Sequence, residues 1–427
     1  PLMRTRSTTH INIGCQSPKK VPDFPSGANQ GIRGISVHLI LLLGMASLFG
    51  SLISNGARSV IGPYILLLGG SAAVVGLVVG FGELVGYALR FATGIYADQS
   101  HQYWKMAMAG YGLLITIPLL AFIGSWEMAA FLIISERVGK AIRTPARDTI
   151  LSSATVTVGR GWGFGIHKAL GQIGAVAGPL IVAAALALTG EYATGFLLLG
   201  FPLAGVAASL LLAQSAVPKP GRLEVQMSRS DKAFANLPGV APYATFIFFS
   251  MAGFANFPLI SFHMKAQSIT PDTTIPLFYA SAMVISVTVA LIIGRAFDRI
   301  GIHALLAIPI LSTVTALLAF SLTPSLVIAG SLAWGAGIGL SETVVRAAIA
   351  ESTTLEYRGE AYGILSATFG AAWFIGSVVM GILYEVSLAH IVAYVVIVEI
   401  VAVATYLWIY RARIAAWVRN GARDLAP

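Results

Sequence analysis

The stretch GIYAD at residues 94–98 returns as GRAFD at residues 294–298. The two copies lie 200 residues apart (294 minus 94) and share their glycine and their aspartate. A second pair follows in the same order, with RGWGFGI at residues 160–166 and RGEAYGI at residues 358–364, at an offset of 198. Two matches in order at nearly one offset indicate an internal repeat, so we expect the chain to consist of two related halves.

Apolar runs long enough to cross a bilayer surround both copies. The sequence is 56% hydrophobic and only 11% charged, with a mean hydropathy of +0.81, whereas soluble domains are about 25% charged. A membrane-spanning helix needs about 20 mostly apolar residues, and an open strand edge in lipid would leave backbone groups unpaired. We predict an all-α membrane protein with twelve transmembrane helices, at residues 36–56, 72–96, 105–124, 126–148, 161–189, 192–214, 241–264, 273–297, 302–322, 324–348, 360–384 and 388–411.

The longest polar interruption lies near the middle of the chain and divides these spans six and six. Residues 215–238 contain Pro218, Pro220 and Gly221 together with mixed charges, which is typical of a linker. The predicted organisation is a tail (1–35), a six-helix bundle (36–214), a linker (215–240), a second six-helix bundle (241–411) and a second tail (412–427).

The charge of +9 and the pI near 9.7 do not indicate nucleic-acid binding, because the basic residues are not gathered with aromatics on a soluble domain. They fall in alternate loops. If both termini are cytoplasmic, the outer loops carry only Arg58 and Lys265 as basic residues, which is the positive-inside pattern. We therefore expect both tails in the cytoplasm and the protein in the plasma membrane, the inner membrane of a bacterium. The single cysteine, Cys15, allows no intrachain disulfide and suggests no metal site.

The repeated motif resembles the Gly-x-x-x-Asp-Arg-x-Gly signature between helices 2 and 3 of the major facilitator superfamily. The second half keeps Gly294, Asp298, Arg299 and Gly301, whereas the first half keeps only its glycine and aspartate. The resemblance covers about residues 36–411. It implies two pseudo-symmetric six-helix bundles that enclose a central cavity and expose it alternately to the two sides of the membrane.

A second motif, in helix 5, is similar to the antiporter signature of efflux members of the superfamily. It consists of Gly174, Gly178 and Pro179, with Val182 and Ala183 in place of the trailing glycines. We expect close helix packing, rather than a direct part in motion, to be the role of these small residues. The run at residues 136–148 resembles a branch of bacterial members.

The resemblance also gives the repeated aspartates a gating role. It implies that Asp98 faces the start of helix 11 near Gly359, and that Asp298 faces the start of helix 5 near Gly161, where free N–H groups favour an anion. Our hypothesis is that these two aspartate contacts close the cytoplasmic gate while the cavity faces outward. Gly94 and Gly294 belong to the same gating motif. The alternative is simple helix capping.

Charged and titratable residues at membrane depth are costly, and we treat them as candidates for proton coupling or substrate binding. They are Glu83, Arg90, Glu136, Arg137, Lys140, His167, Lys168, Glu342 and Arg346. Glu83 is the foremost candidate, since a carboxylate taken out of water binds a proton more readily. The alternative is that these charges are paired and fix helix contacts, for instance Glu342 with Arg346 four residues on.

In this superfamily helices 1, 4, 7 and 10 line the cavity, so we expect polar and aromatic residues of these helices and their neighbours to contact substrate. The candidates are Ser51, Asn55, Tyr87, Glu136, Arg137, Asn256, Trp334 and Trp373. The phenylalanines of helix 7 and His263 are more simply interpreted as core or lipid-facing residues.

Our leading functional hypothesis is a secondary active transporter that exports small amphipathic molecules in a proton-coupled manner. An organic anion or zwitterion is the alternative substrate, because Arg90, Arg137, Lys140 and Lys168 outnumber the carboxylates at depth in the first half. A membrane protein that binds, signals or moves lipid without pumping is the alternative of another class. We expect no enzyme activity and no cofactor besides an ion gradient, since no phosphate loop, metal cluster or catalytic triad is visible. The expected partners are a small-molecule substrate and the lipid bilayer, with no nucleic acid, and the expected state is a monomer.

Overall fold

The computed structural model describes residues 26–156, 158–218, 240–352 and 358–423, and in this part of the chain the regular elements are all helices. The first half contains α1 (Ser26–Arg58), α2 (Ile61–Leu67), α3 (Ala72–Ser100), α4 (Tyr103–Gly112), α5 (Thr116–Leu119), α6 (Trp126–Thr155), α7 (Arg160–Thr189), α8 (Tyr192–Leu198) and α9 (Pro202–Ala216). The second half contains α10 (Val240–Ala252), α11 (Phe257–Ala266), α12 (Ile275–Ile300), α13 (Ala307–Ala319), α14 (Pro324–Ser352), α15 (Arg358–Val386) and α16 (Leu388–Arg423). Short 3₁₀ turns flank α5 at 113–115 and 120–122, and η4 (Gly301–Leu306) joins α12 to α13.

Ten helical stretches of the described residues are long and apolar enough to cross a membrane. One of them, Ile275–Ala319, contains both α12 and α13. The charged helix α6 is not among them, because it carries two glutamates, an aspartate, a lysine and three arginines. The all-α membrane fold is thus confirmed, and the number of twelve spans stays a prediction.

The seventh predicted span, 241–264, is not one continuous helix, and this corrects the sequence-based interpretation. It breaks after Ala252 and resumes as α11. In the first half, α1 contains the whole of the first predicted span, ends at Arg58 and is followed by the separate helix α2. Pro63 and Pro258 lie in the first turns of α2 and α11, where a missing N–H costs no helical hydrogen bond. Helical structure also extends into both predicted tails, because α1 begins at Ser26 and α16 continues to Arg423.

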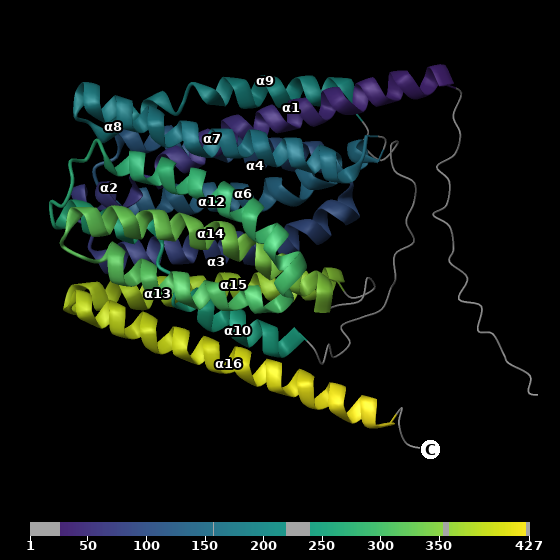
Figure 1. Cartoon of the computed structure of the whole chain (residues 1–427). Helices are drawn as coiled ribbons and strands as arrows, with labels where there is room; N and C mark the ends of the chain where they lie inside the picture. The colour runs from purple at the N-terminus through teal and green to yellow at the C-terminus, as the bar shows by residue number, and fades with distance from the viewer. Residues whose placement is uncertain (1–25, 157, 219–239, 353–357, 424–427) are drawn as a thin grey trace, which may run out of the picture.

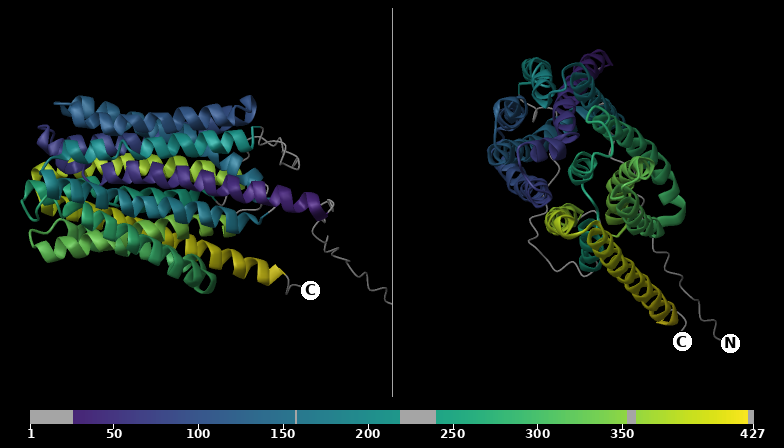
Figure 2. Two further views of the ribbon diagram at one scale, coloured as in Figure 1. Left: turned by 90° about the horizontal axis from the view of Figure 1, so that it is seen from above. Right: turned by 90° about the vertical axis from the view of Figure 1, so that its left-hand side faces the viewer.

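Both described ends of the chain lie at the same end of the bundle (Figure 1), which we call the tail end, with the far end opposite. The long helices run roughly along one direction between these ends, and viewed along them they surround a central region (Figure 2). Which membrane face each end meets stays a prediction, with the tail end expected in the cytoplasm.

The halves meet most closely at the far end, where α2 packs on α11 and the start of α3 packs on the last part of α15. A Cβ atom added at Gly62 would lie 1.9 Å from the Pro258 carbonyl oxygen, and one at Gly76 would lie 2.2 Å from that of Ser377. The backbone N–H of Ala73 donates to Glu385 Oε1 at 3.0 Å across the same interface. Backbone-to-backbone contact through glycine therefore closes the far end.

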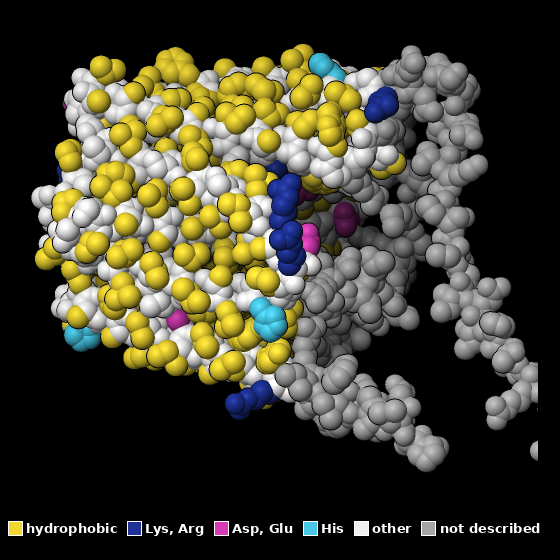
Figure 3. All heavy atoms as spheres, viewed as in Figure 1, with side chains coloured by type: hydrophobic (Ala, Val, Ile, Leu, Met, Phe, Trp, Pro, Cys, Tyr) yellow, Lys and Arg dark blue, Asp and Glu magenta, His cyan; other side chains and the backbone are white. Residues whose placement is uncertain are grey.

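The tail end is open. Figure 3 shows acidic and basic side chains gathered around a hollow there. A Cβ atom added at Gly161 would meet nothing within 4 Å, and one at Gly94 would meet only Pro145 at 3.8 Å. If the tail end is cytoplasmic, this conformation faces inward.

The gating residues lie at this open end. Asp298 and Arg299 are exposed, and among the described residues no hydrogen bond or ion pair reaches the Asp298 side chain, so its expected contact with the start of α7 is absent in this conformation. Asp98 is half-buried. Its expected contact near Gly359 lies outside the residues whose side chains are described. Gly301 ends α12 with a φ of +58°, a left-handed conformation that favours glycine.

Candidate functional site

A cavity of about 230 Å³ lies between the halves. Six of the eight residues that we predicted as its lining contribute to its wall, namely Ser51, Asn55, Tyr87, Asn256, Trp334 and Trp373. Four of the predicted charged residues also line it: Glu83, Lys140, Lys168 and Glu342. The structure adds residues that sequence reasoning did not single out, notably Arg58, Gln172, Tyr279, Met283, Ser286 and Phe369. Contact of these residues with a substrate stays a prediction.

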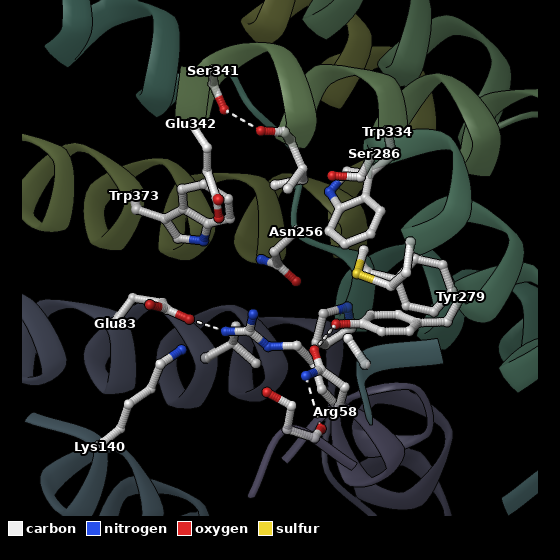
Figure 4. Close-up of a pocket in the computed structure, with 18 of the residues that line it drawn as sticks. Arg58, Glu83, Lys140, Asn256, Tyr279, Ser286, Trp334, Ser341, Glu342 and Trp373 are labelled. Atoms are coloured by element: carbon white, nitrogen blue, oxygen red, sulfur yellow. Dashed lines mark hydrogen bonds and ion pairs between the residues drawn. The ribbon is translucent and has the colours of Figure 1, made fainter. Parts of the chain in front are cut away.

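Arg58 is a cavity residue and not, as predicted, part of an outer loop. It is the last residue of α1, and the break between α1 and α2 places it inside the bundle. It forms an ion pair with Glu83 of α3, and Arg137 Nη1 of α6 lies 3.7 Å from the same carboxylate oxygen. Figure 4 shows Arg58 between Glu83 and Tyr279. Glu83 is therefore a carboxylate shared by two guanidinium groups.

Glu136 and Arg137, which we also listed among the cavity candidates, are buried in the first half and do not line the cavity. Glu136 is 2% exposed and accepts hydrogen bonds from Ser54 Oγ at 2.8 Å and Arg143 Nη2 at 3.1 Å, with Arg137 Nε at 3.6 Å. Its carboxylate is thus held by three groups, which is a structural arrangement for a buried charge.

Lys140 lies one turn beyond Glu136 on α6, and its side chain enters the cavity (Figure 4). In the described part of the chain its ammonium group takes part in no ion pair and no hydrogen bond. The charges within electrostatic range are mostly positive, with Arg58, Arg90 and Arg137 opposed by Glu136 and Glu342. Lys140 is therefore a cavity amine without a bonded partner among the described residues.

The pair predicted within α14 is replaced by an ion pair across the halves. Lys168 Nζ of α7 lies 3.1 Å from Glu342 Oε2 of α14. The two side chains are 66% and 47% exposed. Arg346, one turn further toward the tail end, is exposed as well. The Lys168–Glu342 contact lies on the path between the cavity and the open end, and an exposed pair of this kind contributes about 0–1 kcal/mol.

Two asparagines lie near the helix breaks, 201 residues apart (256 minus 55). Asn256 Oδ1 accepts from the Leu259 N–H at 2.8 Å and so caps α11, while its Nδ2 donates to Ser377 Oγ at 3.1 Å. Asn55 Oδ1 accepts from the Tyr279 hydroxyl of the other half at 2.8 Å. The floor of the cavity on its far-end side is thus a hydrogen-bonded contact between the halves.

Aromatic rings form the second-half wall. The Trp334 ring contacts Phe257 and Tyr279 with centroid distances of 5.2 and 5.7 Å, and Phe369 stacks on Trp373 at 5.4 Å. Trp334 Nε1 donates to the Ala255 carbonyl at 2.9 Å. Trp373 Nε1 is buried with no acceptor among the described residues.

Two predicted candidates lie outside the lining. The Arg90 guanidinium stands over the Tyr87 ring, 5.1 Å from its centroid. His167 is 7% exposed in α7, and its Nε2 has no partner among the described residues. The structure gives neither residue a direct contact with the cavity.

Glycines of the helix 5 motif serve packing in this structure. Cβ atoms added at Gly174 and Gly178 of α7 would lie 2.0 and 2.1 Å from the carbonyl oxygens of Leu48 and Leu52 in α1. These glycines allow the backbones of α7 and α1 to touch.

Comparison with known proteins agrees with this architecture. The sequence profile of the Major Facilitator Superfamily matches residues 46–340 and 243–426. An uncharacterised protein of Mycobacterium tuberculosis is 38% identical over 385 residues, covering 88% of this chain and 94% of the relative. An uncharacterised MFS-type transporter of Methanocaldococcus jannaschii is 32% identical over 152 residues, covering 35% of this chain and 37% of that protein.

Solved structures share the fold at low sequence identity. The nucleoside transporter NupG superimposes with a TM-score of 0.69 at 17% identity, covering 86% of this chain and 99% of its own. A bacterial homologue of the lysosomal transporter Spinster, in an inward-facing and unoccupied conformation, gives a TM-score of 0.66 at 15% identity, with 88% and 97% of the two chains covered. With a helix break in each half, a cavity between two halves and a family match over most of its length, this chain belongs to the Major Facilitator Superfamily of transporters.

Proposed function

We propose that the protein is a secondary active transporter for small amphipathic molecules that carry an anionic or zwitterionic group. The observation that carries the proposal is Lys140, an ammonium group in the cavity without a partner among the described residues. Both carboxylates that line the cavity are already engaged, Glu83 by Arg58 and Glu342 by Lys168. A cation at membrane depth is costly unless it is paired. An anionic group of the substrate would supply the partner that Lys140 lacks.

The aromatic wall supports an amphipathic substrate. Trp334, Phe369 and Trp373 present ring surface opposite the charged wall formed by α3 and α6. A molecule with an apolar or planar body and one acidic group could place the body against the rings and the acid near Lys140.

The sharing of Glu83 between Arg58 and Arg137 supports a coupling scheme in which a proton and an anion bind together. An anion that binds Arg58 competes with the Glu83 carboxylate, and a displaced carboxylate at membrane depth is neutralised most readily by a proton. The scheme favours co-transport over the proton-coupled export that the helix 5 motif suggested, because packing accounts for the glycines of that motif. A cationic substrate would instead compete with the proton for Glu83, which would lead to exchange of the substrate for a proton.

The test uses the purified full chain and a panel of monocarboxylates, amino acids and lipophilic amines. A ligand that binds the folded state raises the thermal unfolding midpoint, so binding is measured by thermal shift and then by uptake into proteoliposomes under a pH gradient. We expect acidic compounds to bind. Lys140→Gln should weaken the binding of acidic compounds by about tenfold to a hundredfold, since a hydrogen bond to a charged group contributes about 1.5–3 kcal/mol.

The matched control is Lys105→Gln, which removes an exposed lysine outside the cavity and should leave binding unchanged. Binding of amines but not acids, with equal affinity in the Lys140→Gln variant, would favour the exporter of cationic amphipaths.

A further inference from the structure

Glu399 is a buried carboxyl group that the transport scheme above does not use. It lies on α16 near the middle of the apolar stretch Leu388–Arg411, and it is 2% exposed. In the described part of the chain neither carboxyl oxygen has a hydrogen-bond partner, and no basic side chain lies within ion-pair distance. An ionised carboxylate in such a place costs several kcal/mol, so the group is neutral in this conformation.

Among the described residues, the Ser312 hydroxyl is the one group beside the carboxyl that could stabilise a negative charge. The helices α10, α13 and α15 pack against α16, and α13 carries no charged or titratable side chain. On α10 the one such residue is Tyr243, near the tail end, and on the described part of α15 they are Tyr384 and Glu385, near the far end. Tyr394 of α16 is within electrostatic range of the carboxyl, but its hydroxyl donates to the Ala252 carbonyl at 3.2 Å.

The carboxyl group lies directly against the break between α10 and α11. A Cβ atom added at Gly253 would be 2.5 Å from Glu399 Oε1. Ser312, which lies beside the carboxyl, donates its hydroxyl to the Gly253 carbonyl at 3.0 Å. The backbone at the break is therefore satisfied by other side chains, and its carbonyl oxygens oppose a negative charge at Glu399.

The break also leads into α11, the helix whose packing on α2 closes the far end. Three residues separate Gly253 and Phe257, the first residue of α11, and α11 packs on α2 of the other half. Opening the far end separates α11 from α2, and a movement of α11 about the break would change the surroundings of Glu399. Water that enters at the break could then solvate the ionised form.

A mainly apolar crevice of about 380 Å³ between α13 and α16 touches the stem of Glu399. Both carboxyl oxygens are nevertheless buried away from it. A ligand bound in the crevice from the lipid side would contact Val396 and Val403 and would not reach those oxygens, so the geometry favours a proton over a lipophilic amine.

We propose that Glu399 is a proton-binding site separate from the central cavity, protonated while the far end is closed and deprotonated when α11 moves about Gly253 to open that end. The proposal rests on the alternating access of the proposed function but not on the identity of the substrate.

The direct test is infrared difference spectroscopy of the purified full chain, in which a protonated carboxylic acid gives a carbonyl stretch distinct from that of a carboxylate. We expect such a band near neutral pH in the wild type, its loss in Glu399→Gln, and its retention at a shifted position in Glu399→Asp. Glu385→Gln, which removes a far-end carboxylate bonded to the Ala73 N–H, serves as the matched control and should keep the band. A wild-type spectrum that Glu399→Gln leaves unchanged would overturn the proposal.

Transport in proteoliposomes gives the second readout. Glutamine matches the neutral carboxyl in size, so Glu399→Gln should fold and exchange substrate across the membrane, yet lose acceleration by a pH gradient. Retention of that acceleration would also overturn the proposal. Lys140→Gln should weaken substrate binding while keeping the infrared band, which separates failure of this proposal from failure of the proposed function.

Discussion

The glycine contact between α3 and α15 allows one prediction to be worked out in detail. A Cβ atom at Gly76 would lie 2.2 Å from the Ser377 carbonyl oxygen and 3.0 Å from its carbonyl carbon. The Ser377 carbonyl oxygen belongs to the backbone and cannot rotate away. Gly76→Ala therefore has to separate the two helices by about 1 Å to reach an ordinary contact distance. Overpacking of this kind costs about 1–3 kcal/mol.

That cost falls on the conformation in which the far end is closed. The equilibrium should therefore move toward opening of the far end by roughly 5- to 150-fold. Gly86→Ala is the matched control on the same helix, because a Cβ atom there would meet nothing within 4 Å.

The assay is maleimide labelling of single cysteines introduced at the far-end and tail-end mouths, in a chain whose only native cysteine, Cys15, is replaced by serine. Gly76→Ala should label faster at the far end and more slowly at the tail end, while Gly86→Ala should match the parent. Equal labelling rates in all three proteins would refute the idea that glycine contact holds the far end closed.

Three further perturbations test other parts of the molecule. Glu83→Gln should abolish the pH dependence of transport while preserving anion binding, since Arg58 and Arg137 lose a competing carboxylate; unchanged coupling in proteoliposomes would remove Glu83 from the mechanism. Replacing Asp98 and Asp298 by Asn should favour the conformation open at the tail end, measured by labelling a tail-end cysteine, and an unaltered rate would leave helix capping as the explanation. Arg143→Gln removes a partner of the buried Glu136 and should cost about 3–5 kcal/mol of stability, measured as a lower unfolding midpoint than that of exposed Arg299→Gln; equal midpoints would contradict the structural role of this pair.

The fold could be predicted from the sequence because it depends on local signals. Runs of apolar residues of membrane length predict helices without reference to anything distant, and the repeat around Asp98 and Asp298 predicts two halves. The six lining residues followed from the resemblance together with polar or aromatic character at depth. These features belong to single helices.

The helix breaks could not be predicted in the same way. Residues 253–256 lie inside an apolar run, and their break is stabilised by Ser312, Trp334 and Tyr394 from three other helices. The site role of Arg58 depends on the corresponding break in the first half, and Tyr279 joins the site only because it meets Asn55 across the halves. Glu399, by contrast, could have been found, because a lone carboxylate in the run 395–403 is a charge at membrane depth.

The Lys168–Glu342 contact has a consequence for how the two ends respond to ionic strength. Its side chains are largely exposed, so dissolved salt screens their attraction, with a Debye length of about 8 Å at 0.15 M. The glycine contacts at the far end involve no net charges, and screening leaves them as they are. Added salt should therefore weaken the Lys168–Glu342 contact toward the tail end and leave the glycine contacts at the far end unchanged. The ionic strength of the buffer can thus be used to perturb one gate without the other.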